Sequence, residues 1–235
     1  MITVATWNVL HRVHAENWYE DVARRWPDEQ ARIAAVTARV AALTEQVIAL
    51  QEVSGDQLVS LRAALPERTV HALRYPRLPR PRRIETALTD RDEYLVLLVN
   101  GPSEQTAAES FASDPGKGLL AAQAFGITVV ATHVTGDDRR GGQLARLAEL
   151  GTDLKGTVLL GDFNIARDHV AAGLGPDFTV PNFAPGSPPT RPRTSGAKSQ
   201  YIDLVVGCGV PVSDPTVEDV AGLSDHNLVR ATIDI

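Results

Sequence analysis

Five short polar signatures stand at the ends of apolar runs, and their residue types suit phosphate chemistry. They are Trp7-Asn8, Gln51-Glu52, Asp162-Phe163-Asn164, Tyr201-Ile202-Asp203 and Ser224-Asp225-His226-Asn227. Carboxylates, carboxamides and imidazoles are the groups that hold a hard divalent cation and stabilise a phosphoryl group. An acid and an imidazole side by side at the tip of a strand, as in the last signature, serve chemistry better than packing.

Each signature, taken alone, also has an ordinary structural explanation. Asp162 and Asn164 are two residues apart and would share one face of a strand, yet Asp and Asn at a strand end are equally typical of an Asx turn. Glu52 and Asn8 are compatible with helix-capping or turn chemistry. A lone histidine at a strand end, such as His133, is more often an edge residue than a catalyst.

Asp203 is harder to explain as a structural residue. It interrupts the apolar run YIDLVV, and a buried acid needs a partner to be tolerated. A histidine is the obvious partner, and His226 is available. Asp225, next to it, would hold a cation or orient a neighbour. The signatures are weak one by one and strong together, in this order.

Composition limits the classes of protein that fit. The chain has 235 residues, of which 43% are hydrophobic, and a net charge of −6. This is ample for a core, and it gives no global positive field of the kind that marks a nucleic-acid binder. The single cysteine, Cys208, excludes an internal disulfide and is expected to be a small buried thiol. Because no apolar stretch approaches ~20 residues and the start lacks the pattern of a signal peptide, we expect a soluble cytoplasmic protein.

Hydrophobic periodicity predicts a single mixed α/β domain over residues 1–235. The predicted strands are 2–7, 45–50, 70–75, 94–99, 118–123, 127–132, 157–161, 201–207 and 228–235. The predicted helices are 27–43, 54–65 and 143–154, with a helical turn at the start of 165–173. The runs 94–99, 118–123 and 127–132 are expected to be consecutive antiparallel strands. The stretch 176–198, rich in Pro, Gly, Ser and Thr, is expected to be a long loop.

The order WN, QE, TH, GDFN, YID and SDHN resembles the endonuclease/exonuclease/phosphatase superfamily, whose members share the deoxyribonuclease I fold. The resemblance extends from Thr6 to Asn227; GDFN together with SDH is specific, whereas WN or QE alone would be weak. It implies an α/β (α+β) protein, a four-layer αββα sandwich of two mostly antiparallel sheets flanked by helices. The active site would lie at one edge of the sheets.

The resemblance also implies a role for each matching residue. Glu52 matches the principal ligand of the catalytic Mg²⁺ or Mn²⁺, with Asn8 beside it and Asp225 supporting the metal site. Asp162 matches the residue that positions or deprotonates the attacking water. Asn164 matches the amide that holds the phosphate oxygens. The chemistry of the donors agrees, since oxygen ligands suit Mg²⁺ and a zinc site would need more His or Cys.

The imidazoles receive roles in the same way. Asp203 and His226 match the acid–imidazole pair in which the carboxylate fixes the ring and the ring stabilises charge on the phosphorus. His133 matches the second histidine of the nuclease and sphingomyelinase branches, near the scissile phosphate or the leaving group. In deoxyribonuclease I an acid ahead of a central strand pairs with that histidine, and Asp92 or Glu93 lies in a similar place here.

Three arginines are candidates for binding the substrate phosphate. Arg82 belongs to the arginine-rich segment RYPRLPRPRR, Arg139 follows the strand that ends at His133, and Arg191 lies in the loop before Asp203. A solvated loop explains the arginine-rich segment equally well. The chain also departs from the family, because LTDRDEYLVLL replaces the usual glycine-rich entry to the central strand and the chain is short.

These observations favour a Mg²⁺- or Mn²⁺-dependent phosphoester hydrolase acting on a phosphodiester or phosphomonoester of modest size. The expected partner is a phosphorylated small molecule or a short nucleic acid, with no membrane and no protein partner indicated. The alternative is a DNA or RNA endo- or exonuclease, whose binding would depend steeply on salt. A catalytically silent phosphate-binding protein is the third hypothesis, and the presence of every expected catalytic residue type argues against it.

Overall fold

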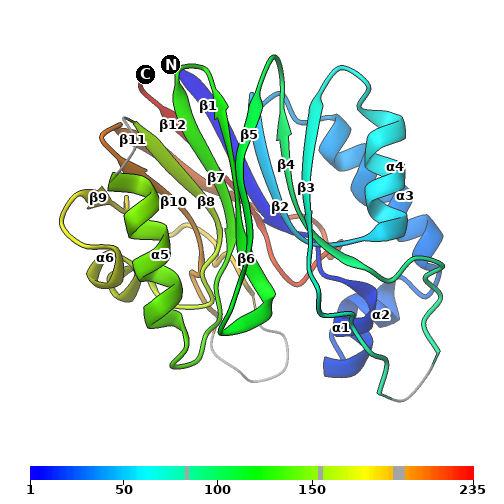
Figure 1. Cartoon of the computed structure of the whole chain (residues 1–235). Coiled ribbons are helices and arrows are strands. Elements are labelled where there is room, and N and C mark those ends of the chain that lie inside the picture. The colour runs from blue at the N-terminus through cyan, green and yellow to red at the C-terminus, as the bar shows by residue number, and fades with distance from the viewer. Residues whose placement is uncertain (83–84, 153–155, 193–198) are drawn as a thin grey trace.

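Two six-stranded sheets pack face to face, and helices cover their outer faces (Figure 1). The computed structural model describes residues 1–82, 85–152, 156–192 and 199–235. The first sheet runs in the order β11 (Val212–Glu218), β12 (Leu228–Ile233), β1 (Ile2–Asn8), β2 (Val47–Ser54), β4 (Glu93–Val99), β3 (Thr69–Arg74). The second runs in the order β5 (Glu104–Phe111), β6 (Asp114–Ala124), β7 (Ile127–His133), β8 (Thr157–Asp162), β10 (Asp203–Cys208), β9 (Phe178–Thr179). The expected sandwich of two mostly antiparallel sheets is confirmed.

The helices of the described residues divide between the two sheets. They are α1 (Arg12–Trp18), α2 (Asp21–Arg25), α3 (Glu29–Ala41), α4 (Gly55–Ala64), α5 (Arg140–Thr152) and α6 (Arg167–Leu174). Apolar residues of α3 and α4 pack on the outer face of the first sheet, and those of α5 and α6 on the second. The short helices α1 and α2 lie instead at one end of the first sheet (Figure 1). No helix in these ranges is long and apolar enough to cross a membrane.

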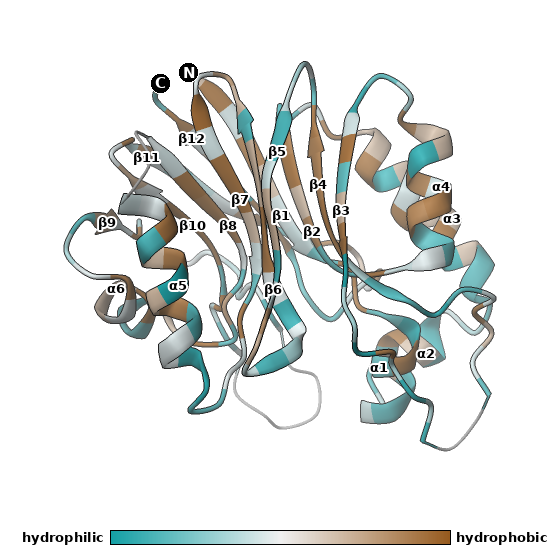
Figure 2. Cartoon of the chain, in the orientation of Figure 1, coloured by the Kyte–Doolittle hydropathy of each residue, from teal (hydrophilic) through white to brown (hydrophobic). Residues whose placement is uncertain are grey.

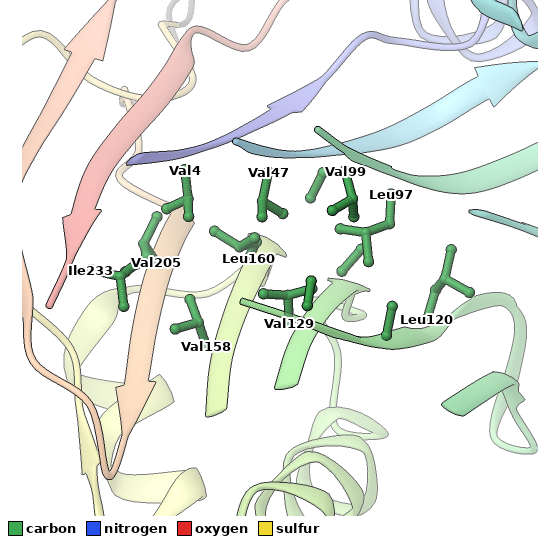
Figure 3. Close-up of a cluster of buried hydrophobic side chains, with 14 of the residues drawn as sticks. Val4, Val47, Leu97, Val99, Leu120, Val129, Val158, Leu160, Val205 and Ile233 are labelled. Atoms are coloured by element: carbon green, nitrogen blue, oxygen red, sulfur yellow. The ribbon is translucent and has the colours of Figure 1, made fainter. Parts of the chain in front are cut away.

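The main core lies between the sheets and follows from the alternation of side chains along each strand. On β8, Val158 and Leu160 point into the layer between the sheets, whereas Leu159 packs under the helices of the second sheet. Figure 3 shows this inner layer, with Val158 and Leu160 on the side of the second sheet and Val4 and Val47 on the side of the first. Figure 2 shows the same strands as the most hydrophobic parts of the chain.

One parallel pair of strands in each sheet positions the polar signatures. β1 is parallel to β2, and β7 is parallel to β8, with helices in both crossover connections. The ends of these strands bring Asn8 beside Gln51 in one sheet and His133 beside Asp162 in the other. β10 is antiparallel to β8, so its first residue, Asp203, reaches the same edge. Strand ends from both sheets thus gather at one edge of the sandwich.

The structure corrects part of the sequence interpretation. The hairpin of β6 and β7 is antiparallel as predicted, but β4 belongs to the other sheet and does not continue it. The elements α1, α2, β5, β9 and β11 were not predicted, because their sequences are short or largely polar. In the described part of the predicted loop, only the two-residue β9 and a bridge between Arg191 and Gln200 are regular. The predicted end of helix 143–154, from residue 153, lies outside the described residues. Cys208 is a buried free thiol, as expected.

Candidate active site

Three acid or imidazole side chains form a row at the edge of the second sheet where β7 and β8 end. The ladder registers place Asp162 beside His133 on one side and beside Asp203 on the other. Residues paired in register lie on the same face of a sheet. Asp162 is 1% exposed, and its Oδ2 lies 3.4 Å from Nε2 of His133. The register itself therefore assembles this wall of the site, called here the ladder wall.

Close strand spacing explains the glycine of the GDFN motif. A Cβ at Gly161 would overlap the backbone carbonyl of Thr132 on the neighbouring β7. Asn164 then turns the chain with a φ of +55°, and its backbone N–H donates to Oδ1 of Asp162 at 2.8 Å. The side-chain amide of Asn164 donates to the carbonyl of Val134 at 3.0 Å. The motif is both an Asx-type turn and part of the site.

Asp203 and His226 form the acid–imidazole pair that the sequence predicted. Nδ1 of His226 lies 3.0 Å and 2.9 Å from the two carboxylate oxygens of Asp203, which is completely buried. The hydroxyl of Thr190 accepts the backbone N–H groups of Ile202 and Asp203 at 2.9 Å and 3.1 Å. Thr190 comes from the long loop and fixes the start of β10, a role that its loop sequence gave no sign of.

The pair carries opposite charges at neutral pH. Burial alone would lower the pKa of His226, but the carboxylates of Asp203, Asp225 and Asp162 raise it to about 10. Burial raises the pKa of Asp203 to about 6, which still leaves it ionised at neutral pH. The second nitrogen, Nε2, is 3.9 Å from Oδ2 of Asp162. An imidazolium N–H therefore faces the ladder wall across a short gap.

Trp7 and Ser224 explain why the WN and SDHN motifs occur together. The indole N–H of Trp7 donates to the backbone carbonyl of His226 at 3.0 Å. The hydroxyl of Ser224 donates to the carbonyl of Asn8 at 2.6 Å and accepts the backbone N–H of His226 at 3.1 Å. Trp7 and Ser224 thus hold the loop before β12 against the end of β1.

Asn8 joins the ladder wall to the first sheet. Its Nδ2 donates to Oδ2 of Asp162 and to Oε1 of Glu52, both at 3.1 Å. Its Oδ1 accepts the backbone N–H of Leu10 at 3.0 Å. One buried amide therefore holds two carboxylates from different sheets.

Glu52 reaches the site from a β-bulge. In the β2–β4 ladder, Gln51 and Glu52 together face the single residue Leu95. Glu52 has a φ of +58°, a left-handed conformation that costs about 1–3 kcal/mol in a non-glycine residue. Bulges beside active sites commonly re-aim a side chain. The backbone N–H of His11 donates to the other carboxylate oxygen, Oε2, at 3.2 Å.

Both central carboxylates are ionised, although Asp162 is buried and Glu52 is only partly exposed. Burial would raise the pKa of Glu52 and of Asp162, but neighbouring imidazoles and the ammonium of Lys117 hold both pKa values well below their usual range. Lys117, on β6, donates a hydrogen bond to Nε2 of His133 and lines the cavity. Burial and Lys117 lower the pKa of His133, which is therefore neutral at neutral pH.

Sequence reasoning missed Lys117. The feature of the sequence that could have identified it is the pair of glycines that flank it in PGKGLL. The structure explains the second glycine, because a Cβ at Gly118 would overlap the backbone of Glu109 on β5. A lysine between two glycines, near the start of an otherwise apolar strand, indicates an ammonium group with a fixed position rather than an ordinary surface lysine.

Asp225 is only partly paired. Its Oδ2 lies 2.7 Å from Nη2 of Arg191 and accepts Nε of the same guanidinium at 2.9 Å. Its Oδ1 is buried, has no hydrogen-bond partner among the residues that the structure describes, and lies 4.0 Å from Nε2 of His226. Arg191, expected to contact the substrate phosphate, lines the cavity but also lies 3.3 Å from Oε1 of Glu20.

The expected partner of His133 is wrong. Glu93 pairs with His14 of α1, whose Nε2 lies 3.0 Å from the Glu93 carboxylate. Asp92 pairs with Arg74 at 2.5 Å. The pairing differs from the expectation because α1 places an imidazole over the start of β4, and no helix was predicted there.

Two of the three candidate arginines do not line the cavity. The guanidinium of Arg82 lies over the ring of Trp18 at 4.7 Å and lines a separate hollow. Arg139 is held by Asp137 at 2.5 Å and Asp114 at 3.3 Å. These acids, rather than a substrate, neutralise Arg139. Arg83, next to Arg82, and Arg193, from the same loop as Arg191, lie outside the described residues.

A polar cavity of about 480 Å³ opens at this edge of the sandwich. It is lined by Leu10, His14, Trp18, Tyr19, Glu20, Asp21, Glu52, Arg77, Lys117, Asp162, Asn164, Arg191, Asp225 and His226. Volumes of roughly 300–1,000 Å³ are typical of small-molecule sites. The eight residues that the motifs singled out meet here, either in its wall or in direct contact with it. They are Asn8, Glu52, His133, Asp162, Asn164, Asp203, Asp225 and His226.

The donor set fits a hard divalent cation. Glu52 and Asp162 are ionised and share the Asn8 amide. Oδ1 of Asp225 is a buried carboxylate oxygen that no group in the described part of the chain hydrogen-bonds. Such oxygens are the usual ligands of Mg²⁺ and Mn²⁺. Ligand atoms of Asp162, Asp203 and His226 also lie within 4.8 Å of one another. Because Asp203 and His226 are bound to each other, the carboxylate oxygens of Glu52 and Asp225 are the better ligands.

Solved structures with this fold include proteins of different activity. TDP2 of C. elegans is 15% identical, with a TM-score of 0.68 over 100% of this chain and 75% of that chain. A Bacteroides vulgatus protein described as an endonuclease/exonuclease/phosphatase is 17% identical, with a TM-score of 0.68 over 100% and 98%. A mannosyl-6-phosphatase of Bacteroides thetaiotaomicron is 14% identical, with a TM-score of 0.67 over 100% of both chains. At these identities the likeness shows the fold alone.

The sequence assigns the chain to a family, which these structures do not. No curated protein matches it. The profile described as Endonuclease/Exonuclease/phosphatase family matches residues 5–226, which include all the signatures except the last residue of the final one. The chain belongs to this family of phosphoester hydrolases.

Proposed function

We propose that this chain is a Mg²⁺- or Mn²⁺-dependent phosphoester hydrolase acting on a small phosphorylated molecule or a short nucleic acid. One observation carries the proposal. The ionised Asp162 and the imidazolium of His226 face each other at 3.9 Å in the wall of a cavity of about 480 Å³. A proton acceptor and a charged donor at this separation suit attack of water on a phosphoryl group.

Asp162 is the residue that activates the water. Its carboxylate is held by the Asn8 amide and by the backbone N–H of Asn164, so its position is fixed before a substrate binds. It accepts a proton from a water placed between it and the phosphorus atom. Pre-organised acceptors of this kind contribute typically about 10²–10⁴-fold in rate.

His226 and Lys117 counter the charge that develops on the phosphoryl oxygens. The imidazolium of His226 is kept protonated and oriented by Asp203, and its Nε2–H is the group left for an oxygen of the substrate. Lys117 lines the cavity beside His133. Asn164 also lines it and completes the set of groups beside the phosphate.

Glu52, Asn8 and Asp225 are the residues that would hold the cation. When bound, a divalent cation neutralises phosphoryl charge and acts as a Lewis acid. The low pKa of Glu52 supports this assignment, as does Oδ1 of Asp225, which has no hydrogen-bond partner within residues 1–82, 85–152, 156–192 and 199–235.

The dimensions of the cavity favour a small substrate. Leu10, His14 and residues 18–21, from α1 and the segments next to it, belong to its lining, and the chain as a whole carries a net charge of −6. Neither feature suits a long polyanion, whose binding depends on many basic contacts. Solved structures with this fold include a mannosyl-6-phosphatase, and the proposal for this chain covers monoesters and diesters alike. The cytoplasmic location expected from the sequence remains a prediction.

The test is a metal-supplemented activity screen on the full chain. The panel contains 4-nitrophenyl phosphate, bis(4-nitrophenyl) phosphate, sugar phosphates, nucleotides, single-stranded oligonucleotides and plasmid DNA, each in Mg²⁺, Mn²⁺ or EDTA. We expect turnover of a small ester that EDTA abolishes and that His226→Gln lowers by about 10³-fold. His169→Gln, on the exposed face of α6, is the matched control and should leave the rate unchanged.

The other two hypotheses give different results in the same screen. A nuclease that acts on long polymers would cleave plasmid DNA in preference to small esters and short oligonucleotides, with binding that weakens steeply as salt rises. A silent binding protein would turn over nothing in either metal. Either result would overturn the proposal.

A further inference from the structure

A third imidazole faces the cavity, and neither the motifs nor the proposed chemistry assigns it a role. His14 lies on α1, lines the cavity and exposes 20% of its side chain. Its Nε2 is 3.0 Å from Oε2 of Glu93, the first residue of β4, whose side chain is 1% exposed. The arrangement mirrors the Asp203–His226 pair, with a buried carboxylate behind an imidazole that reaches the cavity.

The buried position of Glu93 indicates that the pair is built rather than incidental. A buried carboxylate without a charged partner is strongly disfavoured. Burial raises the pKa of Glu93, but His14 more than offsets this and leaves the pKa lowered. Burial lowers the pKa of His14, but Glu93 and Glu52 outweigh it and leave the pKa raised. The pair therefore favours a carboxylate and an imidazolium.

The orientation of the ring leaves one nitrogen for a substrate. Because Nε2 is engaged by Glu93, Nδ1–H is the ring donor that remains, and His14 lines the cavity. The ring of His11 packs against that of His14, with centroids 5.4 Å apart and planes tilted by 55°. His11 is itself anchored, since its side chain accepts the backbone N–H of Val13 as the N-cap of α1. The His14 ring is thus held from two sides.

His14 and Asp162 reach the cavity from different sheets. His14 lies on α1, at one end of the first sheet (Figure 1), and pairs with Glu93 of β4 in that sheet. Asp162 is the last residue of β8 in the second sheet. Both residues line the cavity. In phosphoryl transfer the attacking and leaving oxygens are roughly in line on opposite sides of phosphorus.

We infer that His14, oriented by Glu93, is a catalytic residue that protonates the leaving oxygen of the substrate. This inference rests on the proposed function. Water attacks phosphorus and gives a proton to Asp162. As the bond from phosphorus to the leaving oxygen breaks, its electron pair stays on that oxygen, which takes the Nδ1 proton of His14. The imidazole regains a proton from solvent, and Asp162 releases one to solvent, so the cycle is balanced.

The dependence on the leaving group tests this role. The substrates are phenyl phosphate and 4-nitrophenyl phosphate, or the corresponding diesters if the enzyme prefers them. Phenolate resembles a tyrosinate, with a pKa of about 10, and needs protonation as it leaves. 4-Nitrophenolate is far more stable as an anion and does not. Loss of a general acid should therefore slow the first substrate much more than the second.

The variants are His14→Gln and Glu93→Gln in the full chain with Mn²⁺. The glutamine amide at position 14 imitates Nε2 and keeps a donor for Glu93, while it removes the Nδ1 donor. We expect His14→Gln to lower kcat for phenyl phosphate about 100-fold and for 4-nitrophenyl phosphate less than about 5-fold. Glu93→Gln, a change at a positioning residue, should shift the same ratio in the same direction by about 10-fold. His169→Gln should leave it unchanged.

Several outcomes would overturn the inference. An equal loss on both substrates in a folded protein would make His14 a binding or structural residue, and no loss would remove it from the mechanism. His14→Asn, which keeps an Nδ1-like donor but loses the contact with Glu93, replaces the first variant if that one fails to fold. It should then retain more activity on phenyl phosphate than His14→Ala. An inactive wild-type protein would instead contradict the proposed function itself.

Discussion

The two sides of the cavity are built by different means. On the ladder wall, adjacent strands β7, β8 and β10 present His133, Asp162 and Asp203 in one row, and the register alone sets their spacing. On the opposite side, which we call the bulge wall, Glu52 comes from a β-bulge and His14 from a short helix. Regular pairing produces the first wall, and two local irregularities produce the second. A site of this kind can vary on the irregular side while the regular side stays fixed by the sheet.

The largest expected effect is on the ladder wall. Asp162→Asn keeps the size of the side chain but removes the proton acceptor, so we expect kcat to fall about 10³–10⁴-fold on any ester that the wild type hydrolyses. Steady-state kinetics in Mn²⁺ measure it. The folded structure should persist, because Asn can still accept the backbone N–H of Asn164. A loss of less than tenfold would show that the row does not activate the water.

The next prediction concerns the cation and compares one residue of each wall. Glu52→Gln removes an ionised oxygen ligand of the bulge wall and should weaken Mn²⁺ binding on the order of 100-fold. Asp203→Asn on the ladder wall should change it less than about 3-fold, because that carboxylate holds His226 instead. Calorimetric titration of both variants decides the matter. The reverse result would place the ion among Asp162, Asp203 and His226.

The ladder wall is also the part that the sequence predicted best. The runs VLLGDFN and YIDLVV are short apolar stretches with an acidic residue near one end, and they match the family motifs, so strand ends and site residues were found together. The bulge wall could not be predicted in the same way. Nothing in VIALQEVS indicates that Glu52 takes a positive φ, and RVHAENW has too little apolar periodicity to predict α1. Without α1, Glu93 was assigned to the wrong histidine. Contacts between residues far apart in the sequence, rather than the local sequence pattern, determine the structure of the bulge wall.

The bulge wall should show a specific sensitivity to acid. Burial lowers the pKa of His11 to about 4, so the folded protein keeps it neutral while the unfolded chain protonates it near 6.5. Between these values the unfolded state binds more protons, and stability therefore falls as pH falls from 6.5 to 4. The full effect is about 3 kcal/mol. Urea unfolding in EDTA across this range measures it.

The control for this measurement is His11→Asn, which retains a side-chain acceptor for the N-cap of α1. The variant should show a shallower loss of stability between pH 6.5 and 4 than the wild type, and the difference between the two isolates His11 from the carboxylates. Parallel curves for both proteins would contradict the assignment of His11 as a neutral buried group.

Strand spacing on the ladder wall gives a smaller effect. Gly161→Ala places a methyl group against the carbonyl of Thr132, so β7 and β8 must separate. We expect a loss of about 1–3 kcal/mol in unfolding free energy and a lower kcat, because the row of His133 and Asp162 shifts with the strands. Gly142→Ala on α5 meets open space and should instead raise stability by about 0.5–1 kcal/mol without changing kcat. Equal effects at both positions would show that the close approach of β7 and β8 is not the reason for Gly161 in the motif.

The smallest effect tests whether the bulge depends on the helix that follows it. The hydroxyl of Ser54 accepts the backbone N–H of Gln57 and caps α4, two residues after Glu52. Ser54→Ala should cost about 1 kcal/mol in unfolding free energy. Because Glu52 is held separately by Asn8 and the backbone of His11, kcat and Mn²⁺ affinity should stay within about twofold of the wild type. A larger loss of Mn²⁺ affinity would mean that the cap of α4 determines the conformation of the bulge. The position of Glu52 on the bulge wall would then depend on the first turn of that helix rather than on contacts within the site.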